Sequence, residues 1–494
     1  MNNGDLIAAI DIGSNSFRLE VARFTNGHIE RVDYLKETVR LGADLNHDKE
    51  LSAQAMARGW ACLARFGERI RDFPADNVTA VATQTLREAS NRGAFVAKGQ
   101  ALLGFEIDVI AGPEEARLIY QGVAHNLPDD PSPRLVVDIG GRSTEFMLGA
   151  GLESSALASY RVGSVSWSQR YFPQGQLSAE AFNNAIIAAK ALLDEALTTF
   201  KRANWQLAFG SSGTVGAVAE VLKANGRGEA GITHADLNWL IARLCKCKTT
   251  EDIDLAGVKP DRKPVIGGGV SVLKAIFELF DIDTMQVAKG ALRHGALQDL
   301  VQRDGGVGQL RDHTVHYLMQ RFNVDAAHAT LVQQTALHFF DQLCGKDGTH
   351  LPARKRLAWA ASLHEIGAIV SHNDAPAHGA YVLSHADAPG FSIDELHTLG
   401  QLVLGQRGKL RKVEPLLDNA SFRIKLICLR LACLLCHARK PPELKHLRLK
   451  LTNDTFKLTL NATWAQHYPQ SMWLLHEEAK YWERTNWSID IDGL

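Results

Sequence analysis

Two short glycine-containing sequences recur in this chain and constrain its fold more than any other feature. They are Asp11-Ile-Gly-Ser-Asn-Ser16 and Asp138-Ile-Gly-Gly-Arg-Ser-Thr144. Each lies between two apolar runs, so each predicts a β-hairpin with a tight turn and an aspartate at its entrance. Glycine lets backbone N–H groups approach a phosphate closely, and Ser, Thr and Asn side chains add donors. The repeat therefore predicts a duplicated fold whose halves face each other across a phosphate-binding cleft.

The composition is that of a globular protein with several domains. The chain has 494 residues, of which 46% are hydrophobic and 22% charged, enough for about three domains with large cores. The first residues are polar and lead straight into a strand-like run, so no targeting segment is expected. The apolar run 422–438 contains three cationic residues and is not expected to cross a bilayer. These features predict a cytoplasmic protein that does not bind membranes.

The seven cysteines do not suggest a disulfide framework, because their number is odd and their spacing indicates no pairs. Cys433-Leu-Leu-Cys-His437 matches the pattern of covalent haem attachment. That chemistry requires an exported chain, and the segment is typical of a buried helix, so no haem is expected.

The net charge of −1 hides one basic segment. Between Arg407 and Lys450 there are 12 Lys or Arg residues and 3 Asp or Glu residues. Such a segment favours an extended polyanionic ligand. A solvated helix face or an acidic partner surface is the alternative.

The order of predicted elements indicates three domains, at 1–124, 125–304 and 305–494. Strands and helices alternate up to a Pro- and Asp-rich stretch at 126–133, and the second hairpin then restarts the pattern. Gly210-Ser-Ser-Gly-Thr214 joins a strand to a helix, another phosphate-binding geometry. The triple glycine at 267–269 is expected to precede a helix over 270–280. Beyond about residue 308 the chain is predicted to be helical, with a small αβ ending.

Several residues have the chemistry that phosphoanhydride hydrolysis needs: a base for water, cations for the phosphate oxygens and a divalent metal. Glu115 opens a helix after Pro113, where an acidic residue is also an ordinary partner of the helix dipole. Arg87 is expected at the end of a strand. Asp138 and Glu145 bracket the second loop and can reach one hard cation such as Mg²⁺, although Asp138 is also a typical turn-stabilising residue.

A set of ordered motifs resembles one known family. The motifs are Asp11-Ile-Gly-Ser-Asn-Ser-Phe-Arg18, Thr83-x-Thr-Leu-Arg-x-Ala-x-Asn91, Gly112-x-Glu-Glu-Ala-Arg117, Asp138-Ile-Gly-Gly-x-Ser-Thr-Glu145, Gly210-x-Ser-Gly-Thr214 and Gly290-Ala-Leu-Arg-x-Gly295. Over its whole length the chain resembles the exopolyphosphatase/guanosine pentaphosphate phosphohydrolase family. The resemblance implies an α/β fold: a duplicated actin-like (ribonuclease H-like) two-domain phosphatase followed by a mainly helical domain similar to the His-Asp (HD) phosphohydrolase bundle.

The resemblance also implies roles for individual residues. Glu115 aligns with the catalytic base, Arg87 with the phosphate-clamping arginine, and Asp138 and Glu145 with the carboxylates beside Mg²⁺, to which we add Asp11. Glu145 is thereby counted with the catalytic residues as well as with the metal ligands. The expected phosphate-binding residues lie in the three loops: Gly13, Ser14, Asn15, Ser16, Gly140, Gly141, Ser143, Thr144, Gly210, Ser212, Gly213 and Thr214.

The chain departs from the family pattern in two places. Arg142 stands in the second loop where the family usually has Gly or Ala, and we expect this bulky side chain to point to solvent. The helical domain has His364-Glu365 in place of the His-Asp signature, with His372, His378 and His385 nearby. Because the metal-binding aspartate is replaced, we expect a structural bundle without a metal.

These observations predict an Mg²⁺-dependent exopolyphosphatase that removes the terminal phosphate of inorganic polyphosphate. The basic segment favours this long polyanion. The alternative substrate is guanosine pentaphosphate (pppGpp), which would place the protein in the stringent response, with Arg262 as a candidate contact to the nucleotide. An ATP-dependent sugar or acetate kinase and a non-catalytic sensor remain further alternatives. The resemblance implies a homodimer, and no nucleic-acid partner is expected.

Overall fold

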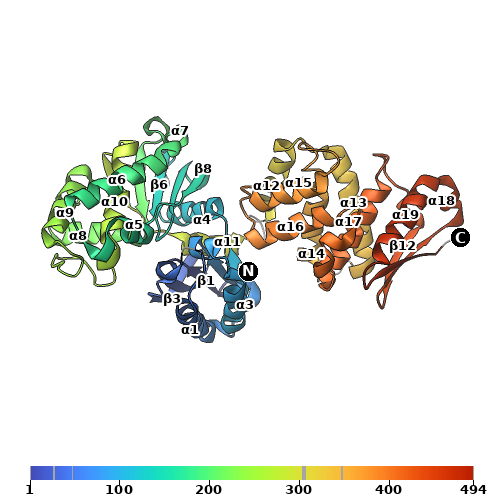
Figure 1. The fold of residues 1–494 in the computed structure, drawn as a ribbon, viewed down its shortest axis with the longest axis horizontal. Helices are drawn as coiled ribbons and strands as arrows, with labels where there is room; N and C mark the ends of the chain where they lie inside the picture. The colour runs from blue at the N-terminus through green and yellow to red at the C-terminus, as the bar shows by residue number, and fades with distance from the viewer. Residues whose placement is uncertain are drawn as a thin grey trace. The chain divides into compact units, whose positions relative to one another are not determined.

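The computed structural model describes residues 2–25, 28–46, 48–128, 130–302, 308–345 and 349–492. The chain forms two compact units, Met1–Gly308 and Gln309–Leu494 (Figure 1). The first unit contains two α/β lobes, and the second is mainly helical.

The first lobe is built on a five-stranded sheet in the order β3-β2-β1-β4-β5. Strands β1 and β2 form the predicted antiparallel hairpin, and β4 and β5 add to it in parallel. The strands are β1 (Leu6–Ile12), β2 (Phe17–Thr25), β3 (His28–Glu37), β4 (Val78–Ala82) and β5 (Asp108–Val109). The main helices are α1 (Ala53–Ile70), α2 (Gln84–Glu88), α3 (Arg92–Leu103) and α4 (Gly112–Ala124). Helix α3 ends at Leu103, and Gly104 caps it with a φ of +85°, a left-handed conformation that glycine adopts without strain.

The second lobe repeats this arrangement on a six-stranded sheet in the order β10-β11-β9-β6-β7-β8. Its hairpin β6–β7 is again the predicted one, and β9 pairs with β6 in parallel, as β4 does with β1. The strands are β6 (Arg134–Ile139), β7 (Thr144–Ala150), β8 (Glu153–Tyr160), β9 (Leu207–Ser211), β10 (Ile232–Thr233) and β11 (Thr284–Val287). The main helices are α5 (Ser164–Tyr171), α6 (Ala179–Leu193), α8 (Ser212–Ala224), α9 (His234–Cys247), α10 (Ile266–Phe280) and α11 (Leu292–Gln302).

Helices α4 and α11 pack against each other in the middle of the first unit (Figure 1). Glycines allow this close approach: a Cβ on Gly295 would lie 1.8 Å from the carbonyl oxygen of Leu118, and one on Gly290 would lie 1.8 Å from that of Gly122. Larger residues would force the two helices apart.

The triple glycine does not precede its helix, as the sequence suggested, but lies inside the first turns of α10. A Cβ on Gly268 would come within 2.5 Å of the Ser164 carbonyl oxygen and the Ser168 amide nitrogen. The glycines therefore serve close packing against α5 and do not interrupt the helix.

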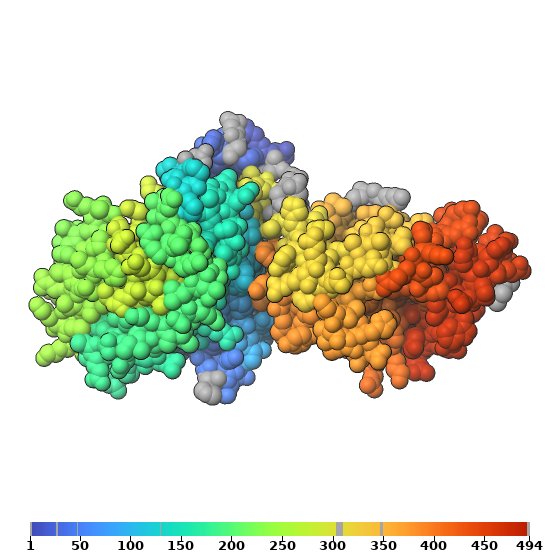
Figure 2. Space-filling view, turned by 90° about the horizontal axis from the view of Figure 1, so that it is seen from above, coloured from blue at the N-terminus to red at the C-terminus, as the bar shows by residue number. Residues whose placement is uncertain are grey.

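The second unit is a helical bundle followed by a small αβ part, as predicted. The bundle helices are α12 (Gly308–Arg321), α13 (Ala326–Cys344), α14 (Leu351–Ser362), α15 (Ala375–His385), α16 (Ile393–Gly405) and α17 (Ala420–Leu435). Three strands and two helices follow: β12 (Leu447–Thr452), β13 (Thr455–Leu460), α18 (Ala462–His467), α19 (Pro469–Trp482) and β14 (Ser488–Asp492). The C-terminal part packs on the bundle through α13, α17 and α19, and the two form a continuous surface in the space-filling view (Figure 2).

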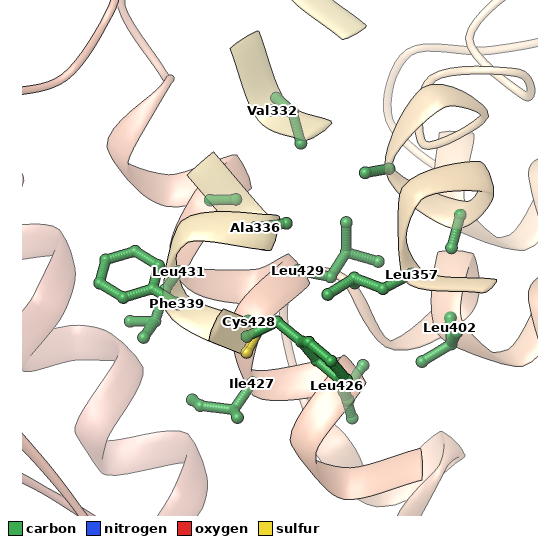
Figure 3. Packing of buried hydrophobic residues seen from close by; sticks show 14 of the residues in the cluster. Val332, Ala336, Phe339, Leu357, Leu402, Leu426, Ile427, Cys428, Leu429 and Leu431 are labelled. Atoms are coloured by element: carbon green, nitrogen blue, oxygen red, sulfur yellow. The ribbon is translucent and has the colours of Figure 1, made fainter. Parts of the chain in front are cut away.

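The core of this unit explains why α17 is so apolar. Figure 3 shows Leu426, Ile427, Cys428 and Leu429 of α17 among side chains from α13, α14 and α16. The helix is buried in a protein core, and none of the described helices is long and apolar enough to cross a membrane.

Three cations of the basic segment are buried in this unit and are not available to a polyanion. Arg430 pairs with Glu478, Arg423 donates to the Leu417 carbonyl oxygen, and Lys425 donates to Ser421. Burial lowers the pKa of Lys425 to about 8. The segment is therefore less of a charged surface than its composition suggests.

Candidate active site

The tips of the two hairpins meet, as the sequence predicted. A Cβ on Gly141 in the second loop would lie 3.0 Å from the Cβ of Ser14 in the first. Within each hairpin the aspartate pairs across the strands with a charged residue: Asp11 lies opposite Arg18, and Asp138 lies opposite Glu145. The duplicated turns thus converge although they are far apart in the sequence.

A cleft of about 370 Å³ lies where the hairpin tips meet. Both lobes line it, and most of the predicted phosphate-binding residues are present: Gly13, Ser14, Asn15, Ser16, Gly140, Gly141, Ser143, Ser212, Gly213 and Thr214. The acidic residues Asp11, Glu115 and Asp138 also line the cleft. A site rich in backbone N–H groups and hydroxyls beside carboxylates suits a phosphate chain carried with a divalent cation.

Two predicted phosphate-binding residues do not line the cleft. The hydroxyl of Thr144 is fully buried and donates to the carbonyl oxygen of Val162. Gly210 lies within β9, where a Cβ would meet the side chains of Met285 and Val215. Both residues serve the packing of their turns and do not face the cleft.

The turn from β9 into α8 has strained backbone geometry. Ser212 has a φ of +87°, in the left-handed region that favours glycine, and its hydroxyl accepts from the amide of Thr214. This conformation places the beginning of α8, a 13-residue helix, at the wall of the cleft. The N–H groups of a helix N-terminus attract anions.

Two buried polar atoms of the site have no hydrogen-bond partner among the described residues. They are the hydroxyl oxygen of Ser16, which lines the cleft, and Oε2 of Glu145. The other carboxylate oxygen of Glu145 accepts a hydrogen bond from Ser159 at 2.8 Å. A buried carboxylate oxygen without a donor is costly, so these atoms fit contact with a ligand or a cation.

The carboxylates of the site raise one another's pKa. Burial raises the pKa of Asp138 to about 6, with Ser211 and Arg18 acting in the opposite direction. Burial raises the pKa of Glu145 well above its usual value, and the neighbouring Glu115 and Asp138 add to this. Several buried carboxyl groups that raise one another's pKa indicate a binding place for a positive ion.

Glu115 and Arg87 form a pair at the edge of this cluster. Arg87 Nη2 lies 3.0 Å from Glu115 Oε2, and burial raises the pKa of Glu115 although Arg87 opposes the shift. The sequence predicted Arg87 at the end of a strand. In the structure it lies on the short helix α2, which follows β4. Neither Arg87 nor Glu145 is among the residues that line the cleft.

The expectation that Arg142 points to solvent is wrong. Its side chain is only 19% exposed and reaches from the second lobe to the first. Its Nε donates to Glu88 Oε2 at 3.1 Å, and its Nη1 donates to the Gly42 carbonyl oxygen at 3.0 Å. The arginine side chain therefore leaves the loop toward Glu88 and Gly42.

Sequence reasoning missed several cationic and aromatic residues of the cleft. Besides Arg18, Arg262 and Arg293, which lie in segments singled out above, the lining includes Tyr34, Lys36, Lys259 and Lys289. Arg293 is held by Glu20 and lies over the ring of Tyr34. No local motif marks Tyr34 or Lys36, because they belong to a strand whose position beside the cleft depends on the sheet order.

The second unit contains a separate cluster of possible metal ligands. Ligand atoms of His328, His364 and Glu365 lie within 4.8 Å of one another among the described residues. The cluster contains His328 and not His372, His378 or His385, the histidines that lie near His364-Glu365 in the sequence. Arg439 Nη2 lies 2.8 Å from Glu365 Oε1 and supplies positive charge there. A bundle without a metal stays our prediction for this unit.

Comparison with known families identifies the chain. A model described as the Ppx/GppA phosphatase family matches residues 20–304. The chain belongs to the Ppx/GppA phosphatase family. A second model, Ppx/GppA phosphatase domain III, matches residues 310–479. The chain is therefore a phosphoanhydride hydrolase, and its α/β lobes and helical C-terminal part are those of the family.

Individual relatives agree with this assignment. The chain is 40% identical over 490 residues to proteins from two Vibrio cholerae strains named guanosine-5'-triphosphate,3'-diphosphate pyrophosphatase, with 99% of this chain and 98% of theirs covered. Crystal structures show the same fold. An Aquifex aeolicus Ppx/GppA family member has a TM-score of 0.52 at 24% identity, covering 61% of this chain and 99% of its own. An exopolyphosphatase from Cytophaga hutchinsonii has a TM-score of 0.54 at 22% identity, covering 60% of this chain and 98% of its own.

Proposed function

We propose that this Ppx/GppA family member hydrolyses the 5'-terminal phosphate of guanosine pentaphosphate to give guanosine tetraphosphate and inorganic phosphate. The supporting observation is the 40% identity over nearly the whole chain to the two Vibrio cholerae proteins, whose name states this substrate. The cleft is consistent with it, since carboxylates and phosphate-binding turns lie beside further cations and the aromatic ring of Tyr34.

In the proposed reaction, water attacks the terminal phosphorus in line with the bond to the bridging oxygen. Glu115 accepts the proton of that water, and its raised pKa makes it a stronger base than an exposed glutamate. The phosphorus–oxygen bond breaks, and the bridging oxygen stays with the guanosine tetraphosphate. N–H and hydroxyl groups from the two hairpin turns and from the start of α8 stabilise the charge on the transferred phosphate.

We also propose that Mg²⁺ binds at Asp138 and Glu145, with Asp11 beside them. Two observations fit this proposal. A cation would contact Oε2 of Glu145, which has no hydrogen-bond partner among the described residues. It would also stabilise the charged form of Asp138, whose pKa burial raises to about 6. Asp11 accepts a hydrogen bond from Arg18 at 2.8 Å, which leaves it one oxygen free of that contact. A bound Mg²⁺ would neutralise phosphate oxygens and polarise the terminal phosphorus.

Inorganic polyphosphate, the substrate that the sequence favoured, is the less supported candidate. The argument for it was the basic segment 407–450, and Arg423, Lys425 and Arg430 of that segment are buried in their own unit. By contrast, Arg262 lies at the cleft, close enough to the start of α8 that a Cβ on Gly213 would meet its guanidinium at 2.2 Å. A cation in this position suits contact with the remainder of a nucleotide.

The test is a comparison of substrates with the purified protein. Phosphate release from guanosine pentaphosphate and from long-chain polyphosphate is measured at fixed Mg²⁺, and again after chelation with EDTA. We expect kcat/KM for the nucleotide to exceed that for polyphosphate, and both activities to disappear with EDTA. Faster turnover of polyphosphate would reverse the assignment. Binding of the nucleotide without phosphate release would indicate a sensor, and release that requires a sugar or acetate acceptor would indicate a kinase.

A further inference from the structure

A continuous series of hydrogen bonds leads from Glu115 through Arg87 and Gln84 to Glu88. Gln84 Oε1 accepts from two nitrogens of Arg87, Nε at 2.9 Å and Nη2 at 2.5 Å. The amide nitrogen of Gln84 in turn donates to Glu88 Oε1 at 2.8 Å. The remaining nitrogen, Arg87 Nη1, donates to the Ile110 carbonyl oxygen at 2.6 Å. The guanidinium is therefore held on all sides, with Nη2 directed at Glu115.

The same series continues into the second lobe through Arg142. Nε and Nη2 of Arg142 both contact Glu88 Oε2, at 3.1 and 3.0 Å, so each oxygen of Glu88 has a separate partner. Arg142 also reaches the Gly42 carbonyl oxygen of the first lobe. Arg142 belongs to the loop between β6 and β7, and other residues of this loop line the cleft. One side chain thus links the phosphate-binding loop of one lobe to the support of Arg87 in the other.

We propose that Gln84, Glu88 and Arg142 are positioning residues, which hold the Arg87 guanidinium against Glu115 when the two lobes are together. The proposal rests on the proposed function, since Glu115 is taken as the base of that reaction.

The arrangement has a physical reason. A guanidinium is planar and needs several fixed acceptors to keep one orientation, and Gln84 provides a neutral one that orients Arg87 without competing with Glu115 for its charge. Burial strengthens these contacts: Gln84 is 5% exposed, and the Glu88 side chain is 12% exposed. Without this support Arg87 would sample other rotamers, and a misplacement of about 1 Å near the reacting atoms can cost on the order of 10²-fold in rate.

The structure supplies a matched control. Arg161 Nε also lies near Glu88, 3.7 Å from Oε1, but its side chain is 75% exposed. An exposed ion pair at this distance contributes little. Replacing Arg161 therefore removes one positive charge from the surroundings of Glu88 without breaking the series of hydrogen bonds.

The first experiment measures kcat and KM for guanosine pentaphosphate with Q84A, E88A, R142A and R161A, each in the wild-type chain and in an R87A background. We expect kcat to fall by about 10- to 100-fold for Q84A and by about 3- to 10-fold for E88A and R142A, with KM changed less than about threefold. R161A should behave like its parent. Because the three residues act through Arg87, none should lower the residual rate further in the R87A background. Slow residual rates are followed with substrate labelled in the terminal phosphate.

A second measurement does not depend on activity. The Nε–H signal of Arg87, assigned by its loss in R87A, is followed by NMR in full-length protein labelled at arginine. We expect Q84A, E88A and R142A, but not R161A, to shift or broaden this signal. Equal losses of kcat in both backgrounds, or an Arg87 signal unchanged in R142A and E88A, would overturn the proposal. An inactive wild-type enzyme would instead count against the proposed function, and the NMR result would still decide whether Arg87 is held in this way.

Discussion

Arg87 Nη2 lies 3.0 Å from Glu115 Oε2, and both side chains are nearly buried, with exposures of 12% and 10%. This pair joins α2 to the first turn of α4, at the side of a cleft that both hairpins line. The neighbours on the other side of Glu115 are acids, and Asp138 and Asp11 raise its pKa. Arg87 opposes this repulsion at short range, and in the reaction that we propose it holds the water-activating base in place.

Replacing Glu115 by Gln should remove hydrolysis and leave substrate binding largely intact. Gln keeps the size of the side chain but has no basic oxygen for the proton of water, and general-base catalysis contributes on the order of 10²- to 10⁴-fold. The measurement is the rate of phosphate release from guanosine pentaphosphate together with nucleotide affinity by calorimetry. Glu114→Gln is the control, because Glu114 is buried one residue earlier and pairs with Arg117. It should lower thermal stability and keep most of the turnover. Retained turnover in E115Q would remove Glu115 from the mechanism.

Replacing Arg87 should change the pH dependence of turnover. The charge and hydrogen bond of Arg87 lower the pKa of Glu115, so their loss in R87A raises that pKa further. The deprotonated base is then available only at higher pH, and the acidic limb of the kcat profile moves to more alkaline values. Rates are measured from pH 5.5 to 9.5 at saturating substrate, where R87A should lose more activity at the acidic end. R87K keeps the charge and should shift less, and a profile that moves to lower pH would contradict the pairing.

The Glu145 carboxyl should make the protein less stable at alkaline pH when no divalent cation is bound. Its folded pKa is raised above the usual value of 4.5, so between these two values the native state binds more protons than the unfolded state. Stability then falls as pH rises through this window, by about 1.4 kcal/mol for each unit of pKa difference. Glu145→Gln stays neutral and should raise the melting temperature in EDTA more at pH 8 than at pH 5.

The control for this prediction is Glu153→Gln on β8, since Glu153 is exposed. It should change the melting temperature by the same small amount at both values of pH. A stabilisation by E145Q that is equal at pH 5 and pH 8 would show that packing, and not charge, is responsible. Hydrolysis by E145Q should be lost in either case if the carboxylate holds the metal.

The sequence predicted the parts of the site that depend on local chemistry. Each hairpin is fixed by strand-forming runs around a glycine turn, so Asp11 and Asp138 could be placed at turn entrances without the structure. The helix that carries Glu115 in its first turn was predicted from Gly112-Pro113, which the structure places at the start of that helix. The duplication then indicated that the two turns face one cleft.

The rest depends on contacts between distant segments, which no local pattern encodes. Arg142 was expected in solvent because its acceptors, Glu88 and Gly42, come from another lobe. The basic segment suggested an exposed charged surface for a similar reason. Arg430 pairs with the buried carboxylate of Glu478 because α17 and α19 pack together, which the sequence does not show. The triple glycine predicted a helix that starts only after it, because the sequence does not show that α5 packs against these glycines inside α10.

The crossing of α4 and α11 should tolerate no side chain at Gly295. A Cβ there would lie 1.8 Å from the Leu118 carbonyl oxygen, so Gly295→Ala must push α4 and α11 apart and should destabilise the first unit by about 3 kcal/mol or more. Gly93→Ala in α3 is the matched control, because a Cβ at Gly93 meets nothing within 4 Å, and it should be neutral or stabilise by up to about 1 kcal/mol. Hydrogen exchange of the α4 amides in the full-length protein measures the effect where it arises. Exchange should be faster in G295A, unchanged in G93A and unchanged in the helices of the second unit. Slow exchange of α4 in G295A would mean that the two helices do not pack as closely as these glycines indicate. Since Glu115 lies in the first turn of α4, its fixed distance to Arg87 would then be in question as well.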